Sequence, residues 1–287
     1  MMTNNIAGKI IGLIATVVIS STLQNAPGQA DQPRLAALLK KSADYCRRLD
    51  SAALDFVCLE EVTEASRFYA SKTDAYVYDY QFNRMDVSRS ETAQTDVYLY
   101  DYQFIRKDLE TKEKRNLIAV NGKKTNIQDS SLNTVMFQYK NVLFGPVGLL
   151  SKSWQAYLDY RIIGEDTINK ERAVVIEATP GPAVNEPHCY GRIWIKEDDG
   201  SVLKIVWDQK SLGNFQSVEE WAKAYDAEPQ ITAFSEYGCE KNGLRFPSRN
   251  YTENAQVKKD KQKFVNAEIS IRYKKYRFFT VETEIKY

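Results

Sequence analysis

The stretch Val97–Arg106, Val-Tyr-Leu-Tyr-Asp-Tyr-Gln-Phe-Ile-Arg, constrains its own conformation because large aromatic residues occupy every second position. Successive side chains of a β-strand point to opposite faces of the sheet. The sequence therefore predicts a strand with a mixed face and an aromatic face. The aromatic face, here named the aromatic ladder, carries Tyr98, Tyr100, Tyr102 and Phe104.

A near copy of this stretch precedes it by 22 residues. Residues 76–84, Tyr-Val-Tyr-Asp-Tyr-Gln-Phe-Asn-Arg, match residues 98–106 at most positions. A repeat architecture needs at least about three units, so two copies indicate a local duplication within one domain. We assign the second copy to the main sheet and expect the first copy to belong to a hairpin arm at residues 71–95.

Charge balance limits the kind of partner. The 287-residue chain has 39 Lys and Arg against 38 Asp and Glu. A nucleic-acid binder normally has a clear basic excess, so no nucleic acid is expected as a partner. The length and the 43% apolar content suffice for a sizeable core, and we expect a single domain over residues 31–287.

Residues 1–30 have the pattern of an export signal peptide. Lys9 precedes a mostly apolar run, Ile10–Leu23, and small residues before Ala30 fit cleavage after that residue. The alternative is an uncleaved anchor, but the apolar run is shorter than the ~20 residues that a spanning helix needs. The expectation is a soluble protein outside the cytoplasm.

Four cysteines in an exported chain predict two disulfide bonds. Cys46 with Cys58 would join a predicted helix at residues 31–49, capped by Asp31, to a predicted strand at residues 54–70. Cys189 with Cys239 follows by exclusion. Cys-x-x-Cys spacing is absent and the chain has one histidine, so neither a metal site nor a cofactor is expected.

Residues 141–157 form an apolar segment that is interrupted by Gly145, Pro146 and Gly148. The interruptions argue against a strand, and the segment is too short to cross a bilayer. The pattern predicts the entry of a helix with an apolar face. This helix either plugs the core, which we prefer, or forms a mobile lid over an apolar cavity.

From Tyr160 onward the pattern is mostly that of strands joined by turns, which indicates an antiparallel sheet with one solvated face. Asn121-Gly122, Asn169-Lys170 and Asn242-Gly243 mark tight turns. A loop at Asp198-Asp199-Gly200 would pair Ile195 with Leu203, Ile193 with Ile205 and Gly191 with Trp207. A capping box at Ser217–Glu220 predicts the start of a short helix there.

The sequence shows no recognisable catalytic motif. Nucleophilic catalysis by serine or cysteine normally needs a base, and His188 is the one histidine of the chain. It stands between Pro187 and Cys189, before a predicted strand. The acidic residues fall into no glycosidase or metal-binding pattern. We therefore expect that the protein is not an enzyme.

Several segments resemble the LolA-like outer-membrane lipoprotein-sorting proteins of bacterial envelopes. The resemblance rests on the order of elements, on residues 190–204 (Tyr-Gly-Arg-Ile-Trp-Ile-Lys-Glu-Asp-Asp-Gly-Ser-Val-Leu-Lys), on Phe246–Arg249 and on the ending Tyr276–Tyr287. It implies a mainly β (α+β) fold, in which a strongly curved antiparallel sheet forms a half-open barrel around a few helices. It also implies a periplasmic location.

The resemblance further implies a non-enzymatic carrier for the acyl chains of lipids or lipoproteins. The alternative is an envelope sensor or scaffold on the same fold, whose aromatic strands face outward and dock a protein partner. No binding residue of the family aligns with a specific position here. The candidate ligand-binding residues are therefore those of the aromatic ladder and of the apolar segment: Tyr98, Tyr100, Tyr102, Phe104, Leu143, Phe144, Leu149, Leu150 and Trp154.

Overall fold

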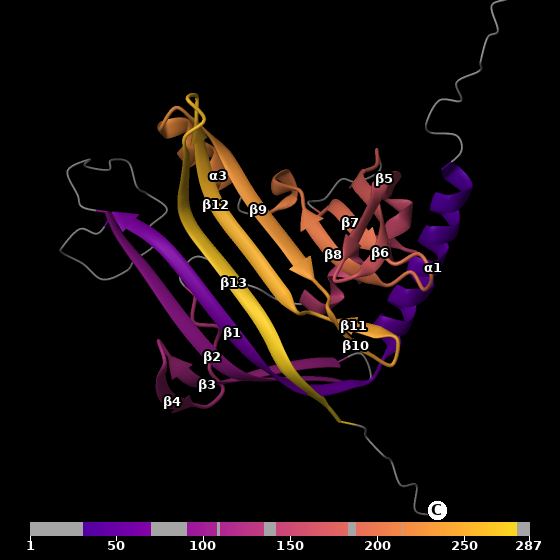
Figure 1. The fold of residues 1–287 in the computed structure, drawn as a ribbon, viewed down its shortest axis with the longest axis horizontal. Coiled ribbons are helices and arrows are strands. Elements are labelled where there is room, and N and C mark those ends of the chain that lie inside the picture. The colour runs from indigo at the N-terminus through magenta and orange to yellow at the C-terminus, as the bar shows by residue number, and fades with distance from the viewer. Residues whose placement is uncertain are drawn as a thin grey trace, which may run out of the picture.

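The computed structural model describes residues 31–69, 91–107, 110–134, 142–182, 188–213 and 215–279. Eleven strands form one antiparallel sheet in the order β4-β3-β2-β1-β13-β12-β9-β8-β7-β6-β5 (Figure 1). The strands of this sheet are β1 (Leu54–Tyr69), β2 (Glu91–Lys107), β3 (Glu110–Val120), β4 (Lys123–Ile127), β5 (Leu158–Ile168), β6 (Glu171–Pro180), β7 (Gly191–Ile195), β8 (Val202–Trp207), β9 (Ala227–Glu236), β12 (Arg249–Lys258) and β13 (Lys263–Phe278).

The remaining elements are short, apart from the first helix. A two-stranded hairpin, β10 and β11, lies outside the large sheet. These elements are α1 (Gln32–Ser51), η1 (Val142–Phe144), α2 (Gly145–Leu150), η2 (Trp154–Ala156), η3 (Gln209–Ser211), α3 (Phe215–Ala224), β10 (Cys239–Lys241) and β11 (Leu244–Phe246).

The order of strands explains why a helical segment crosses one face of the sheet. β4 and β5 are consecutive strands of the chain, yet they form the two opposite edges of the sheet. The chain between them must therefore pass from one edge to the other. On the way it forms η1, α2 and η2, and the apolar side chains of η1 and α2 pack on the face of the sheet that also packs against α1.

We name this face the inner face and its opposite the outer face. One hydrophobic cluster joins α1, α2, the strands β1 and β2 and the distant strands β6, β7 and β8. Strands from both halves of the sheet thus meet the same helices, which requires the sheet to bend around them (Figure 1). The predicted fold class, a curved and open antiparallel sheet around a few helices, is confirmed.

Alternation places the aromatic ladder on the inner face. Tyr100, Tyr102 and Phe104 are buried, whereas the residues between them are only partly buried. Phe104 lies opposite Phe56 of β1, and the two rings stack with centroids 5.1 Å apart. Aromatic cross-strand pairs of this kind stabilise a sheet beyond the area that they bury. The second copy of the duplicated stretch is therefore part of the main sheet, as predicted.

Tight turns fix the register of several hairpins. Asn121-Gly122, Asn169-Lys170 and Asn242-Gly243 each have two positive φ angles and join paired strands directly, as predicted. Two successive positive φ angles match the twist of a two-residue hairpin.

The β7–β8 hairpin follows its predicted register except next to the turn. Gly200 adopts φ +73° and packs against the backbone of α1, where a Cβ atom would lie 2.4 Å from the carbonyl carbon of Lys41. Ile193 pairs with Ile205 and Gly191 with Trp207. Ile195 pairs with Val202 instead of Leu203, because the register shifts by one residue between Trp194 and Ile195.

Other sequence expectations need correction. Asp31 makes no side-chain capping hydrogen bond, and α3 begins at Phe215, before Ser217. None of the four cysteines forms a disulfide bond. Cys46 faces the carbonyl oxygen of Pro146, whereas Cys58 lies on β1 beside Tyr276, so the helix does not bring the two sulfur atoms together.

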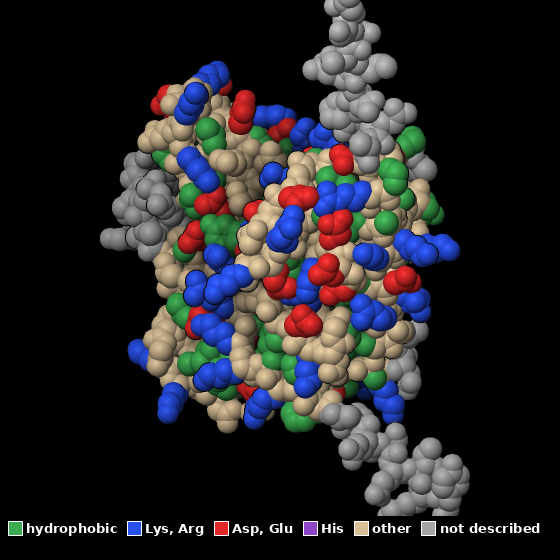
Figure 2. All heavy atoms as spheres, turned by 45° about the vertical axis from the view of Figure 1, so that its right-hand side comes forward, with side chains coloured by type: hydrophobic (Ala, Val, Ile, Leu, Met, Phe, Trp, Pro, Cys, Tyr) green, Lys and Arg blue, Asp and Glu red, His purple; other side chains and the backbone are tan. Residues whose placement is uncertain are grey.

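Some expectations concern residues that lie outside the described part of the chain. These are the signal peptide with its cleavage after Ala30, and the first copy of the aromatic ladder with most of the expected arm at residues 71–95. No helix among the described residues is long and apolar enough to span a membrane. Basic and acidic side chains are interspersed on the surface that Figure 2 shows.

Candidate functional site

Residues 142–150, which form η1 and α2, fill the space between α1 and the inner face, and we name them the plug. Leu143, Leu149 and Leu150 are at most 4% exposed. Phe144 and Val147 are partly buried and pack against the same cluster. In this structure the apolar segment thus has the preferred arrangement, a helix that plugs the core.

Side chains from the surrounding elements hold the backbone of the plug. Five carbonyl oxygens of a nine-residue segment accept a hydrogen bond from a side chain. The donors are Tyr237 Oη to Val142 (3.0 Å), Cys46 Sγ to Pro146 (3.4 Å), His188 Nε2 to Gly148 (2.7 Å), Tyr160 Oη to Leu149 (2.5 Å) and Gln155 Nε2 to Leu150 (2.8 Å). These bonds satisfy buried acceptors that so short a helix leaves open.

The two glycines of α2 have different surroundings. A Cβ atom on Gly145 would lie 2.6 Å from Tyr237 Oη, and the Tyr237 ring is itself only 1% exposed. A Cβ atom on Gly148 would have no neighbour within 4 Å. The N-terminal end of α2 therefore fits tightly against the sheet, and its next turn has free space.

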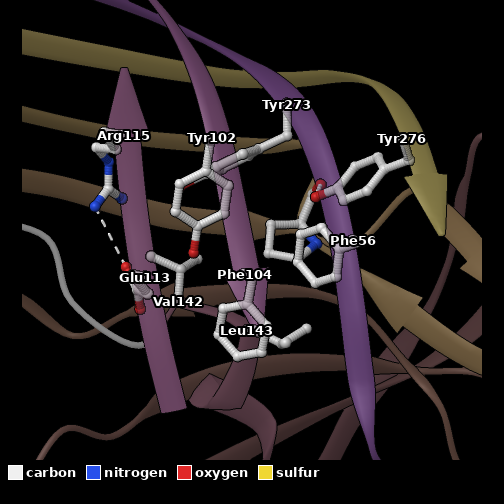
Figure 3. A pocket seen from close by; sticks show the side chains of 10 residues that line it. Phe56, Tyr102, Phe104, Glu113, Arg115, Val142, Leu143, Tyr273 and Tyr276 are labelled. Carbon is white, nitrogen blue, oxygen red and sulfur yellow. Dashed lines mark hydrogen bonds and ion pairs between the residues drawn. The ribbon is translucent and has the colours of Figure 1, made fainter. Parts of the chain in front are cut away.

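A small cavity remains where the plug meets the aromatic ladder (Figure 3). Its volume is about 20 Å³, and Phe56, Tyr102 and Phe104 line it together with Val142 and Leu143 of the plug. A cavity of this size has room for about one water molecule. The cavity is too small for an acyl chain, which could lie on the inner face only if the plug moved.

Arg115 and Glu60 form an ion pair beside this cavity. Arg115 donates two hydrogen bonds to the Glu60 carboxylate, at 2.6 and 3.1 Å, and its guanidinium lies 4.6 Å from the Tyr102 ring centroid. Arg115 also donates to Glu113 at 3.3 Å. Burial lowers the pKa of Arg115, but the hydrogen bond and charge of Glu60 outweigh it, so the pKa is raised. The Arg115 guanidinium therefore remains charged beside the aromatic wall.

The tyrosine hydroxyl groups of this wall remain protonated at physiological pH. Burial raises the pKa of Tyr102, Tyr273 and Tyr276 well above the ordinary value. Burial also raises the pKa of the Cys46 thiol to about 12. These groups therefore act as neutral packing and hydrogen-bonding groups, and a nucleophilic thiolate does not form at Cys46.

The predicted ligand-binding residues occupy three environments. Tyr102, Phe104, Leu143, Leu149 and Leu150 belong to one buried cluster, and Phe144 packs against it. Tyr100 belongs to a second inner-face cluster, with Tyr98 packed at its border. Trp154 lies outside both clusters and stacks on His188, with ring centroids 3.7 Å apart.

This arrangement bears on the alternative function. In that hypothesis the aromatic ladders face outward and dock a partner. The ladder on β2 faces inward, and Tyr100, Tyr102 and Phe104 are buried, so this copy offers no docking surface.

Sequence reasoning missed the buried ion pair. Glu60 is an inward position of β1, two residues from both Cys58 and Val62, which are buried on the same face. Glu60 places a carboxylate at a position of the strand where the alternation calls for an apolar residue. This was the available signal, because a buried charge requires a partner. The identity of that partner depends on the β2–β3 pairing, which sequence does not give.

His188 has a structural environment. Its Nε2 donates to the carbonyl oxygen of Gly148 in the plug, and its ring stacks on Trp154. Within the described residues, no three His, Cys, Asp or Glu side chains are placed to hold a metal ion.

No protein-family model matches the chain, and no curated protein matches it. Solved structures that are similar to the chain include the following three. A putative outer membrane lipoprotein-sorting protein domain from Vibrio parahaemolyticus has 10% identity and a TM-score of 0.37, covering 88% of this chain and 95% of that one. A DUF1329 family protein from Desulfovibrio piger has 11% identity and a TM-score of 0.33, covering 86% and 95%.

The third is a LolA superfamily protein from Nitrosomonas europaea, with 11% identity and a TM-score of 0.31, covering 86% of this chain and 96% of that one. Two of these structures are described as a lipoprotein-sorting domain and a LolA superfamily protein, the group of proteins that the sequence resembles.

Proposed function

We propose that this chain is an exported, periplasmic, non-enzymatic binding protein that holds acyl chains of lipids or lipoproteins on its inner face after the plug withdraws. The observation that carries the proposal is the plug itself. It fills an aromatic concavity with Leu143, Leu149 and Leu150, yet it belongs to no strand of the sheet. Its withdrawal would leave every strand pairing intact.

The burial of the plug's leucines and the burial of an acyl chain contribute free energies of similar size. Burial of a leucine side chain contributes roughly 1.5–3 kcal/mol, so the three leucines of the plug contribute roughly 5–9 kcal/mol. An acyl chain contributes roughly 0.8 kcal/mol for each buried CH₂, so about ten such groups contribute about as much. The burial of an acyl chain can therefore offset the apolar burial that is lost when the plug withdraws, and the broken hydrogen bonds of the plug remain as the cost of opening.

The hydrogen bonds of the plug would set the balance between the two states. A ligand that binds only the open state has an apparent affinity that is reduced by the fraction of open molecules. A change that weakens the closed state should therefore strengthen acyl binding. This relation gives a direct test, because a binding site on any other surface would not respond to the plug.

The test compares Gly145→Ala with Gly148→Ala in a titration with the fluorescent fatty acid cis-parinaric acid. The added methyl group of Gly145→Ala meets Tyr237 Oη and should loosen the closed plug, whereas that of Gly148→Ala enters free space. We expect Gly145→Ala to bind the fatty acid about tenfold more tightly than the wild type. Gly148→Ala should bind no more tightly, because alanine also favours the helix.

A second pair of variants controls for general loss of stability. Tyr160→Phe removes a donor to the plug, whereas Tyr251→Phe removes a hydroxyl that donates to Glu253 and Glu268 on the outer face. Of these two variants, only Tyr160→Phe should raise the fatty-acid affinity. Equal affinities in all four variants, together with no lipid in a solvent extract of the purified protein by mass spectrometry, would refute the proposal.

A further inference from the structure

The outer face carries a groove that the proposed function does not use. It lies over the adjacent strands β9, β12, β13 and β1 (Figure 1) and has a volume of about 610 Å³. Its volume of about 610 Å³ is about thirty times that of the cavity beside the plug, which is about 20 Å³. The groove is therefore large enough for a small ligand without any rearrangement.

Two arginines lie side by side in this groove. Arg249 of β12 and Arg272 of β13 are direct partners in the antiparallel register, and both line the groove. Like charges directly opposite each other destabilise a sheet. Within the described part of the chain, neither arginine forms an ion pair, and the buried Nε of Arg249 has no hydrogen-bond partner.

The carboxylates around the arginines are bound by other groups. Glu236, the direct neighbour of Arg249 on β9, accepts from Lys204 at 3.2 Å. Glu61, the direct neighbour of Arg272 on β1, accepts from Lys274 at 2.9 Å. Glu236 and Glu61 are thus paired with lysines and not with the neighbouring arginines.

The remaining carboxylates are engaged as well. Glu253 accepts from Lys263 at 2.6 Å, and Glu268 accepts from the hydroxyl of Tyr251 at 3.1 Å. Glu61 and Glu268 also line the groove, but within the described residues no carboxylate forms an ion pair with Arg249 or Arg272, so both guanidinium groups keep donors for a ligand.

An aromatic floor and a free hydroxyl complete the groove. The rings of Phe234 and Tyr251 stack with centroids 5.2 Å apart, and the Arg249 guanidinium lies 5.2 Å from the Phe234 centroid. This contact orients the guanidinium, as cation–π contacts do. Ser270 is the register partner of Tyr251 and lies two residues from Arg272, and its buried Oγ has no hydrogen-bond partner.

We infer that this groove binds an oxyanion, a phosphate or carboxylate group, between Arg249 and Arg272. A planar guanidinium presents paired donors that match the oxygen atoms of such a group, and two guanidinium groups hold it more firmly than one. The bound anion would neutralise the opposed charges. The inference is independent of what the inner face binds.

Thermal unfolding of the purified chain in phosphate tests the inference. A ligand that binds the folded state raises Tm, and chloride at equal ionic strength serves as the control because salt also screens the repulsion. We expect phosphate to raise Tm beyond the chloride control. In Arg272→Gln the apparent phosphate affinity should fall by about tenfold or more.

Arg277→Gln is the matched control, because Arg277 is exposed on the same strand and outside the groove. It should keep the full response to phosphate. Arg272→Gln without phosphate should be no less stable than the wild type, since it removes a like-charge contact. A phosphate response that equals the chloride response, or that persists in Arg272→Gln, would overturn the inference for free phosphate.

Flotation with lipid vesicles identifies the source of the anion. Binding to phosphatidylglycerol vesicles but not to phosphatidylcholine vesicles, lost in Arg272→Gln and kept in Arg277→Gln, would assign the site to a lipid headgroup. A response to free phosphate without vesicle binding would assign it to a soluble anion. If neither probe shows a response that depends on Arg272, the groove is not an oxyanion site.

Discussion

Glu60 and Glu61 are neighbours on β1, and they face opposite sides of the same sheet. The Glu60 side chain is 1% exposed and accepts two hydrogen bonds from Arg115. The Glu61 side chain is 33% exposed and accepts one from Lys274. One peptide unit therefore separates a buried ion pair from a solvated one, and the comparison shows how strongly the face of the sheet decides what a charge contributes.

The same contrast extends over both faces. The inner face is filled by the plug and leaves a cavity of about 20 Å³, whereas the outer face bears an open groove of about 610 Å³. Binding on the inner face requires an exchange of one apolar group for another. Binding on the outer face requires only the displacement of water. The two faces should therefore differ in how much a single substitution changes the stability of the fold.

Removal of one partner from each ion pair should give the largest difference. Arg115→Leu leaves the Glu60 carboxylate buried without its partner and should lower the free energy of unfolding by about 3–5 kcal/mol. Lys274→Leu leaves Glu61 in contact with water and should cost at most about 1 kcal/mol. Chemical denaturation of the two variants measures both values.

The double variant Glu60→Gln with Arg115→Leu separates the charge from the loss of packing. It should recover much of the stability that Arg115→Leu loses, because no uncompensated charge remains. Equal losses for Arg115→Leu and Lys274→Leu would show that water reaches Glu60, and the distinction between the faces would fail.

Local patterns were sufficient to predict much of the sheet. Period-two alternation gave the strand at residues 54–70, which the structure places at Leu54–Tyr69, and it also gave the aromatic face of β2. Asparagine and glycine at two-residue turns gave the hairpin positions, because few residues accept the positive φ angles that those turns require. Each of these signals lies within a few residues of the chain.

Features that depend on distant segments could not be predicted in this way. The β1–β13 pairing brings together residues about two hundred positions apart, and this pairing places β4 and β5 at opposite edges. The disulfide prediction failed for the same reason, since sequence spacing put Cys46 near Cys58 while α1 turns Cys46 toward Pro146. Similarly, nothing local placed Arg115 beside Glu60.

Substitutions at two adjacent positions of β13 test the packing of each face. Ile269 is fully buried on the inner face, whereas Ser270 lines the outer groove. Ile269→Ala removes buried methyl groups and should lower the free energy of unfolding by about 2–4 kcal/mol. Ser270→Ala removes a hydroxyl without a hydrogen-bond partner and should change it by less than about 0.5 kcal/mol.

Denaturant titrations of both variants provide the measurement. The value for Ile269→Ala also reports how well the inner face can collapse into a new space, because the cost of a cavity rises with its volume. A cost below about 1 kcal/mol would mean that the inner face repacks freely, which would weaken the picture of a tightly filled concavity.

The ion pair of Glu171 is intermediate between the buried pair of Glu60 and the solvated pair of Glu61. Its pH dependence tests how the burial of the partner changes what a carboxylate contributes. Its side chain is 33% exposed, but its partner Arg245 is 3% exposed and donates two hydrogen bonds to it. These bonds from Arg245 lower the pKa of Glu171 below its ordinary value of 4.5. The unfolded chain therefore takes up the proton at a higher pH than the folded chain does. The stabilisation is complete above about pH 4.5 and is lost as the pH falls through the lower folded pKa.

Glu171→Gln should consequently cost about 1–2 kcal/mol at neutral pH and much less in acid, because the wild-type carboxylate is itself protonated there. Unfolding free energies measured from neutral pH into the acid range give this difference. Glu197→Gln is the control, since Glu197 pairs with Arg34 and both side chains are about a third or more exposed. If the two variants lose the same free energy with the same pH profile, the burial of the arginine has no influence on the strength of these pairs.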